Sequence, residues 1–245
     1  MLYLNKQDII RSITPQEMMD GKALTALRTG GVGGGTVRHL SPADAHTLAV
    51  IGAGVQGANQ AAFACAARPI QHIYVYDAYA KDPVPFIHRL EEVLGETHPP
   101  VTFCASSQEA ARQSQILITA TTSNKPAFPD DSALFAGKCC IGVGSYKPTM
   151  REYPPCLWSL LSQVYVDLPF ACEESGDLSQ PLSEGLLTMD QVITMGQLLA
   201  GQATKLKEGE TAFFKTVGMA LFDLIAAQAI AQKAMEKGIG QKIQL

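Results

Sequence analysis

Three glycines and an aspartate are the first residues whose types and spacing could do chemistry. Gly52, Gly54 and Gly57 give the pattern G-x-G-x-x-G, and Asp77 follows the last glycine by twenty residues. The first glycine permits a tight turn, the second lets backbone approach a pyrophosphate, and the third lets a helix pack closely on a sheet. The N–H groups and positive dipole at a helix start hold phosphates. Asp77 would accept hydrogen bonds from an adenosine ribose and repel a 2′-phosphate, which favours NAD(H) over NADP(H).

The surrounding sequence supplies the elements that must position these residues. Residues 47–51 form a short apolar run of strand type, residues 58–67 an alanine-rich helix, and residues 70–76 a β-branched and aromatic run. Strand, glycine turn, helix and strand ending in an acid are the context that makes the pattern credible. A glycine-rich turn without a ligand is the alternative, which these elements together disfavour.

Further strand-like runs continue along the chain, separated by short helical stretches. Such alternation predicts an α/β fold with a parallel, doubly wound sheet of Rossmann type. The predicted strands are residues 47–51, 70–76, 101–104, 115–120, 138–143 and 163–167, and the predicted helices between them include residues 84–94 and a short helix with a capping box at residues 106–109.

Hydroxyl side chains follow the fourth of these strands. Thr121 and Thr122 come directly after it, and the fifth strand ends in Gly144 and, two residues on, Tyr146. The carboxyl ends of parallel strands are where such sheets bind ligands, so these positions are candidates for a binding site. Asp167 ends the sixth strand, and we interpret it as a structural acid.

The two ends of the chain are harder to interpret. Residues 24–40 have apolar residues at helical spacing, but the five glycines within residues 30–35 weaken any helix and suggest close contact with another helix or a ligand. Arg28, just before them, is either a solvated surface arginine or a bidentate donor for a carboxylate or phosphate. Residues 189–199 are weakly helical, and residues 211–237 are predicted to form the longest helix.

Composition excludes several classes of function. The chain has 245 residues, a net charge of −4 and no basic cluster, which gives no reason to expect nucleic acid. Neither a signal peptide nor an apolar run of about 20 residues is visible, so no membrane association is expected. The six cysteines form no C-x-x-C pair, which is typical of a reducing cytosol, and no His or Cys pair has zinc-ligand spacing. We therefore expect a cytoplasmic protein without a metal.

Five stretches taken together resemble the ornithine cyclodeaminase/μ-crystallin family. They are residues 24–30 (LTALRTG), 51–56 (IGAGVQ), 119–123 (TATTS) with Pro126, 143–148 (VGSYKP) with Glu152, and 214–218 (FKTVG). An arginine stretch ahead of G-x-G-x-Q, with F-K-T-V-G far downstream, is much more specific than a Rossmann turn alone.

The resemblance implies a homodimer in which a Rossmann domain is inserted into a substrate and dimerisation domain. Residues 1–40 would be a remnant of the substrate domain, residues 41–207 the NAD-binding domain, and residues 208–245 a helix returning to the substrate domain. Members of the family move hydride between a nicotinamide and the Cα–N bond of an amino acid or cyclic imine.

The resemblance also assigns site residues by motif match. Arg28 would bind the substrate carboxylate, and Thr216 and Val217, from the start of the predicted last helix, would close over the nicotinamide. The residues that would hold NAD are Gly52, Gly54, Val55, Gln56, Gly57, Asp77, Thr121, Thr122, Gly144, Thr216 and Val217.

Two features depart from the family pattern. True cyclodeaminases and the related alanine dehydrogenases carry a catalytic aspartate where this chain has Tyr146. The match makes Tyr146 the candidate catalytic residue beside Arg28, although a tyrosine is a poor base at neutral pH that can still donate a hydrogen bond. The G-S-Y-K-P form is more similar to the ketimine and pyrroline-2-carboxylate reductase branch. Asp20 also leads directly into LTALRTG, where the family has a long segment that builds most of the substrate domain and supplies a further arginine and lysine.

We therefore predict an NAD(H)-dependent oxidoreductase that acts on a small amino acid or cyclic imine, with a homodimer as the expected assembly. Two alternatives stay open. One is true ornithine cyclodeamination, which Tyr146 disfavours. The other is a catalytically inactive, crystallin-like NAD-binding protein, which both Tyr146 and the missing segment favour.

Overall fold

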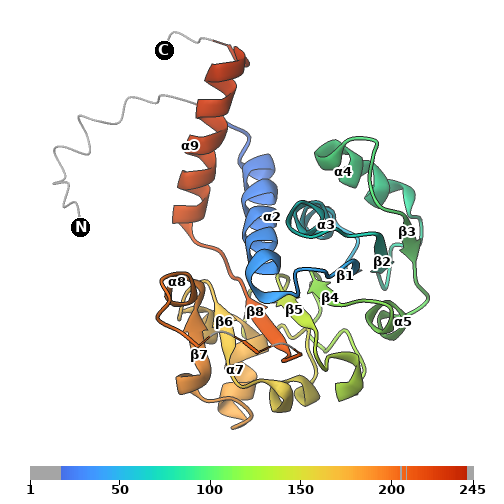
Figure 1. Cartoon of the computed structure of the whole chain (residues 1–245), viewed down its shortest axis with the longest axis vertical. Helices are drawn as coiled ribbons and strands as arrows, with labels where there is room; N and C mark the ends of the chain where they lie inside the picture. Colours follow the sequence, from blue (N-terminus) through green and yellow to red (C-terminus); the bar gives the residue numbers. More distant parts are fainter. Residues whose placement is uncertain (1–17, 205, 208, 242–245) are drawn as a thin grey trace, which may run out of the picture.

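The fold is α/β and is built on a single parallel sheet (Figure 1). The computed structural model describes residues 18–204, 206–207 and 209–241. The sheet has eight strands in the order β3-β2-β1-β4-β5-β8-β6-β7, and every pair is parallel. The strands are β1 (Thr47–Ile51), β2 (His72–Tyr76), β3 (Val101–Phe103), β4 (Ile116–Thr119), β5 (Cys139–Gly142), β6 (Val164–Val166), β7 (Val192–Thr194) and β8 (Ala212–Lys215).

The strand order explains where a ligand can bind. From β1 the chain moves outward to β2 and β3, then returns to place β4 on the other side of β1. This reversal leaves a crevice at the carboxyl ends of β1 and β4, which is the usual ligand position in such sheets. The predicted doubly wound Rossmann-type sheet is confirmed.

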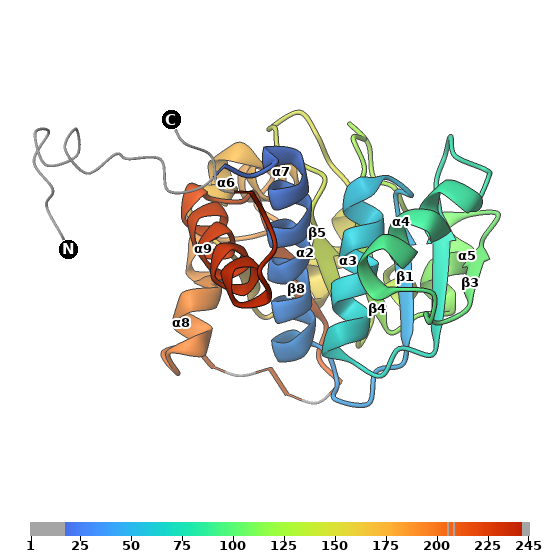
Figure 2. The same ribbon diagram turned by 90° about the horizontal axis from the view of Figure 1, so that it is seen from above.

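Helices cover both faces of the sheet (Figure 2). The α-helices are α2 (Gly21–Leu40), α3 (Val55–Ala67), α4 (Val84–Leu94), α5 (Ser107–Arg112), α6 (Ala171–Glu174), α7 (Gly176–Ser183), α8 (Met195–Leu199) and α9 (Ala220–Lys237), and 3₁₀ turns span Ser132–Leu134, Pro155–Leu160 and Met189–Gln191. Within the described ranges, no helix combines the length and apolar character that a membrane crossing needs.

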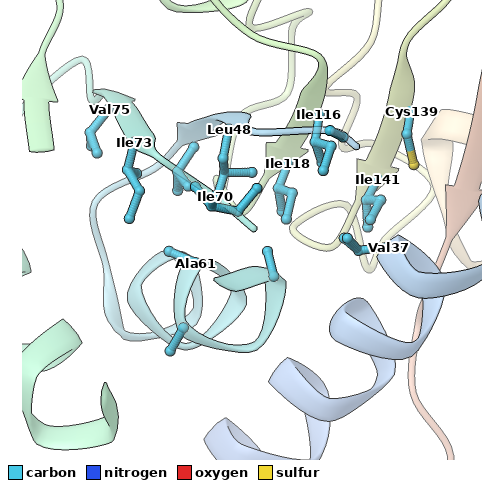
Figure 3. Close-up of a cluster of buried hydrophobic side chains, with 14 of the residues drawn as sticks. Val37, Leu48, Ala61, Ile70, Ile73, Val75, Ile116, Ile118, Cys139 and Ile141 are labelled. Atoms are coloured by element: carbon cyan, nitrogen blue, oxygen red, sulfur yellow. The ribbon is translucent and has the colours of Figure 1, made fainter. Parts of the chain in front are cut away.

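Side chains that point alternately to the two faces of the sheet build two apolar layers. In β1, Leu48 and Val50 belong to the cluster on one face, while Ala49 and Ile51 belong to the cluster on the other. This follows from the two-residue period of a strand. The first cluster lies between the sheet and helices α2 and α3, where Val37 and Ala61 meet the strand residues (Figure 3). The second contains the aromatic residues Tyr153, Trp158 and Phe213.

The glycine-rich stretch is helical, which corrects the expectation that its glycines weaken any helix. They lie within α2, a helix of 20 residues whose N-cap, Asp20, accepts hydrogen bonds from Lys22 N and Ala23 N. A Cβ atom on Gly34 would lie 2.8 Å from the backbone oxygen of Phe63 in α3. Close packing against α3 therefore stabilises a helix that propensity alone disfavours, and of the two contacts expected from the sequence, another helix is the one observed.

The predicted long helix over residues 211–237 is wrong at its start. Residues 212–215 form β8, which lies inside the sheet between β5 and β6, and α9 begins only at Ala220. Both phenylalanines of β8 are buried, Phe214 in one apolar cluster and Phe213 in the other, which is the pattern of a central strand. Residues 189–199, predicted to be weakly helical, also contain the short strand β7.

The terminal parts of the predicted domain division are only partly described. Residues 1–17 lie outside the described ranges, so residues 18–40, which include α2, represent the predicted substrate-domain remnant. Helices α2 and α9 lie side by side beside the sheet (Figures 1 and 2). The domain boundaries at residues 40 and 207 stay a prediction.

Candidate dinucleotide-binding site

A crevice of about 420 Å³ lies at the carboxyl ends of β1, β2 and β4. Five of the predicted NAD residues line it, namely Gly52, Gly54, Asp77, Thr121 and Thr122. They come from the loops after three different strands, so the fold brings together residues up to seventy positions apart in the sequence.

The three glycines of the motif have distinct geometries. Gly52 has φ +107°, and a Cβ atom there would lie 2.5 Å from the Ala120 backbone oxygen. A Cβ atom on Gly57 would lie 2.0 Å from the Gly52 backbone oxygen, so α3 can approach the turn only because this residue is glycine. Gly54 is exposed and faces open space, with nothing within 4 Å of a Cβ position. The tight turn and the close helix packing are as predicted, and the space beside Gly54 can admit a phosphate.

The start of α3 has the properties of an anion site. Helix α3 begins at Val55, and its N-cap, Gly54, has no side chain to accept the first N–H groups. These donors and the helix dipole together favour a phosphate. Gln56, in the first turn, adds an acceptor and not a donor, because its buried Oε1 atom has no hydrogen-bond partner among the described residues. A dinucleotide therefore fits the donors and the space that this turn offers.

Asp77 ends β2 and is held rigidly by the backbone. Its Oδ2 atom accepts a hydrogen bond from Ala53 N at 2.8 Å, and its Oδ1 atom accepts from Tyr79 N and Ala80 N. Partial burial alone would raise the pKa of the carboxyl, but these three hydrogen bonds outweigh it and the pKa is lowered. A carboxylate has about four acceptor positions, so acceptor capacity is left for a ribose hydroxyl.

The loops after β4 and β5 are joined by one buried carboxylate. Glu152 is fully buried, and its Oε1 atom accepts hydrogen bonds from Thr121 N at 2.7 Å and Thr121 Oγ1 at 2.8 Å. Its Oε2 atom accepts from Gly144 N at 2.8 Å and Ser145 N at 3.1 Å. A Cβ atom on Gly144 would lie 2.0 Å from Thr121 O, so Gly144 is needed for the approach of the two loops.

Thr216 and Val217 lie in the turn between β8 and α9, not at the start of the last helix. Asp167, at the end of β6, accepts hydrogen bonds on Oδ2 from Thr216 Oγ1 at 2.7 Å, Val217 N at 2.9 Å and Gly218 N at 2.8 Å. This arrangement agrees with the interpretation of Asp167 as a structural acid. It also fixes the turn in which both predicted site residues lie.

Arg28 lies against the same turn rather than in the crevice. Its Nε atom is 3.1 Å from Asp223 Oδ1 in α9, and a Cβ atom on Gly218 would lie 2.6 Å from Arg28 Nη1. The side chain lines an apolar groove between α2, α3 and α9. Arg28 is therefore neither a freely solvated arginine nor a residue of the dinucleotide crevice.

Tyr146 belongs neither to the residues that line the crevice nor to the turn beside Arg28. The residue is 48% exposed, and the Lys147 ammonium lies 5.4 Å from the centre of its ring. It is absent from the lining of the crevice. Within the described ranges, no cluster of three or more His, Cys, Asp or Glu side chains could hold a metal ion.

Three buried charged residues near the crevice have no role that the sequence patterns predict. Glu152 and Lys215 lie within matched motifs that assign them no function, and Asp177 lies in no motif. The side chains of Asp177 and Lys215 are fully buried, with Lys215 Nζ 3.7 Å from Asp177 Oδ2. The two carboxylates, Glu152 and Asp177, are far apart in the sequence, so no local pattern predicts that they meet. Lys215 lies inside the matched stretch F-K-T-V-G, and a lysine within a strand was the one feature of the sequence that could have indicated a buried charge.

Comparisons with known proteins agree with this geometry. Over 233 residues, the chain is 32% identical to the Delta(1)-pyrroline-2-carboxylate reductase of Bacillus cereus, a match that covers 94% of this chain and 70% of that protein. It is 28% identical over 216 residues to the ketimine reductase mu-crystallin of Rattus norvegicus, covering 87% of this chain and 63% of that protein.

The fold has a solved counterpart with a ligand in place. The structure of Thermococcus litoralis Delta(1)-pyrroline-2-carboxylate reductase in complex with NADH and L-proline matches with a TM-score of 0.81 at 30% identity, covering 92% of this chain and 69% of that chain. The model of the ornithine cyclodeaminase/mu-crystallin family matches residues 10–238. The chain belongs to the ornithine cyclodeaminase/mu-crystallin family.

Proposed function

We propose that this chain is an NAD(H)-dependent oxidoreductase that reduces a small cyclic imino acid of the pyrroline-2-carboxylate type. The single observation that carries the proposal is the crevice in which Gly54, the start of α3 and the ionised Asp77 face one space. A Bacillus cereus relative named for this reaction, and a solved relative that binds NADH and L-proline, support the substrate class.

NAD(H) is the cofactor that the crevice fits. Asp77 would take the adenosine ribose, the start of α3 the pyrophosphate, and Thr121 the half of the dinucleotide that extends over β4. The negative charge of Asp77 disfavours a ribose 2′-phosphate and so disfavours NADP(H). When bound, the nicotinamide supplies the hydride chemistry, and the protein binds and orients it.

Arg28 is the proposed anchor for the substrate carboxylate. Its Nε atom is held by Asp223, and its two terminal nitrogens lie beside Gly218 in the turn that also contains Thr216 and Val217. An arginine held in this way loses little freedom when it binds a carboxylate. The turn itself is fixed by Asp167, so Arg28 and the turn form one rigid unit.

The test is to follow NADH oxidation with Δ1-pyrroline-2-carboxylate and Δ1-piperideine-2-carboxylate. Turnover of either imine supports the proposal. Saturable binding of NADH without turnover of any imine or amino acid would remove the reductase function and select the inactive, crystallin-like alternative. The exposed position of Tyr146, outside the crevice, is the observation that favours this alternative.

True ornithine cyclodeamination is the remaining alternative. It would require release of ammonia from ornithine with catalytic NAD, which the same preparation can test. We expect none, because a tyrosine stands where cyclodeaminases of the family carry an aspartate. A homodimer and a cytoplasmic location also remain proposals, and the oligomeric state can be measured directly by light scattering.

A further inference from the structure

A buried chain of charged side chains connects the loops at one half of the crevice. Asp77 ends β2 and the anion site follows β1, so the second half of a bound dinucleotide must extend over β4 and β5. The loops at the ends of those two strands carry Thr121 and Gly144. Whatever fixes these loops therefore fixes the surface on which the nicotinamide half would lie.

Glu152 is the residue that holds both loops. Each of its carboxylate oxygens accepts two hydrogen bonds, one pair from Thr121 and the other from the backbone of Gly144 and Ser145. The side chain is fully buried, so water cannot replace any of these bonds without a structural change. One carboxylate thus satisfies four donors and leaves none of its acceptor positions free.

Asp177 in turn holds the backbone of Glu152. Its Oδ1 atom accepts hydrogen bonds from Glu152 N at 2.7 Å and Tyr153 N at 3.1 Å. Its Oδ2 atom makes no hydrogen bond among the described residues and faces Lys215 Nζ at 3.7 Å. The ammonium of Lys215, at the end of β8, compensates part of the negative charge of two buried carboxylates.

We propose that Glu152 is a positioning residue for the nicotinamide half of the cofactor, and that Asp177 and Lys215 hold it in place. The network joins the loops after β4 and β5 to each other and to the end of β8, so the two loops keep one relative position. This inference rests on the proposed function for its ligand. It goes beyond that function by separating the two halves of the crevice: Asp77 and α3 serve the adenosine half, whereas Glu152 serves the other.

Glu152→Gln tests this division. A glutamine keeps the size of the side chain but has one oxygen, and its NH₂ group would face two donors. NADH and ADP-ribose serve as the two probes, because ADP-ribose lacks the nicotinamide. We expect the Kd for NADH to rise about tenfold, because loops that are no longer held in place lose about one hydrogen bond to the nicotinamide half, while the Kd for ADP-ribose changes less than about twofold. The fluorescence blue shift of bound NADH should also diminish.

The matched control is Glu96→Gln, which removes the same charge from an exposed position that does not line the crevice. It should change neither Kd. An equal loss of affinity for NADH and ADP-ribose in Glu152→Gln would overturn the proposal, because a general defect of the fold weakens both. Unchanged affinity for both would overturn it as well.

A second variant covers the case in which Glu152→Gln does not fold. Asp177→Asn keeps an oxygen acceptor for the backbone of residues 152 and 153 but removes the charge that faces Lys215. The ratio of the NADH Kd to the ADP-ribose Kd should rise in the same direction by a smaller factor, and an unchanged ratio would contradict the proposal. If the wild-type chain binds both probes but reduces no imine, the proposed reaction is wrong and the role of Glu152 can still be measured. If the wild-type chain reduces an imine but neither variant shifts the ratio of the two Kd values, the role of Glu152 is wrong and the proposed reaction stands.

Discussion

The Asp77 carboxylate accepts a hydrogen bond from the backbone N–H of Ala53 at 2.8 Å, which ties the end of β2 to the glycine turn after β1. Two further backbone N–H groups, from Tyr79 and Ala80, hold its other oxygen. The carboxylate is therefore oriented before any ligand arrives. Orientation in advance lowers the entropy cost of binding a ribose at this position.

Asp77→Asn should weaken NADH binding and reduce the preference for NADH over NADPH. The substitution removes the charge that repels a 2′-phosphate and leaves an NH₂ group where one carboxylate oxygen stood. We expect the Kd for NADH to rise about tenfold or more, as for the loss of a hydrogen bond to a charged group. Fluorescence titrations with both cofactors measure the ratio. An unchanged preference would show that Asp77 does not face the ribose.

Gly54→Ala and Gly57→Ala form a matched pair that separates ligand binding from folding. A methyl group at Gly54 meets no protein atom within 4 Å, whereas one at Gly57 would lie 2.0 Å from a backbone oxygen. Gly57→Ala should lower the free energy of unfolding by about 3 kcal/mol. Gly54→Ala should keep nearly the stability of the wild type but lose NADH affinity. Urea unfolding and NADH titration give the two readouts, and full NADH affinity in Gly54→Ala would contradict a phosphate site at this turn.

Gly34→Ala and Gly35→Ala test the packing of α2 in the same way. A methyl group on Gly34 would lie 2.8 Å from the Phe63 backbone oxygen, while one on Gly35 meets nothing within 4 Å. Gly35→Ala should stabilise the protein by about 0.4–1 kcal/mol, because alanine reduces the entropy of the unfolded chain. Gly34→Ala should destabilise it by about 1–3 kcal/mol. Thermal unfolding of both variants checks the opposite signs.

Arg28→Ala should raise the KM for the imine far more than it raises the Kd for NADH, since Arg28 lies outside the crevice. We expect an increase in KM of about tenfold to a hundredfold, as for loss of a charge-assisted bond to a carboxylate. Arg28→Lys should recover only part of it, because a lysine lacks the planar fork. Steady-state kinetics with pyrroline-2-carboxylate provide the measurement. A larger effect on NADH than on the imine would contradict the assigned role.

The buried Asp177 predicts a pH dependence of stability. Burial raises its pKa to about 6 against the opposing effect of Lys215; Glu152 and Tyr153 are the other titratable groups that face it. Because the folded pKa lies above the unfolded value, the proton stabilises the folded state at low pH, and this contribution is lost as pH rises through about 6. The difference in unfolding free energy between wild type and Asp177→Asn should fall from pH 4.5 to 6.5. A difference that rises over this range would contradict the raised pKa.

Local patterns predicted most of the sheet well. Strands β1 to β6, the helix over residues 84–94 and the cap at Ser106 follow from apolar runs, glycine turns and a capping box, all of which act within a few residues. Gly52 and Asp77 follow from the spacing of the glycine motif and its acid, and Thr121 from its place after a strand, because parallel strands bring their carboxyl ends to one edge.

The remaining features depend on contacts that no local pattern contains. Apolar residues recur at helical spacing through residues 211–237, yet Phe213 and Phe214 lie in a strand that pairs with β5 and β6. Tertiary packing therefore outweighs the local helical pattern at this position. The low helix propensity of glycine predicted an unstable helix at α2, but close packing against Phe63 stabilises this helix. The link from Lys215 through Asp177 to Glu152 joins residues far apart in sequence, and only the folded chain brings them within reach.

The measurement that tests the central claim most directly is a calorimetric titration of the chain with NADH, repeated with Asp77→Asn. We predict one saturable site per chain with a Kd on the order of micromolar, in the range usual for enzyme ligands, and much weaker binding to the variant. Absence of saturable binding at millimolar NADH, or equal affinity of the variant, would contradict a dinucleotide site in the crevice between Gly54 and Asp77.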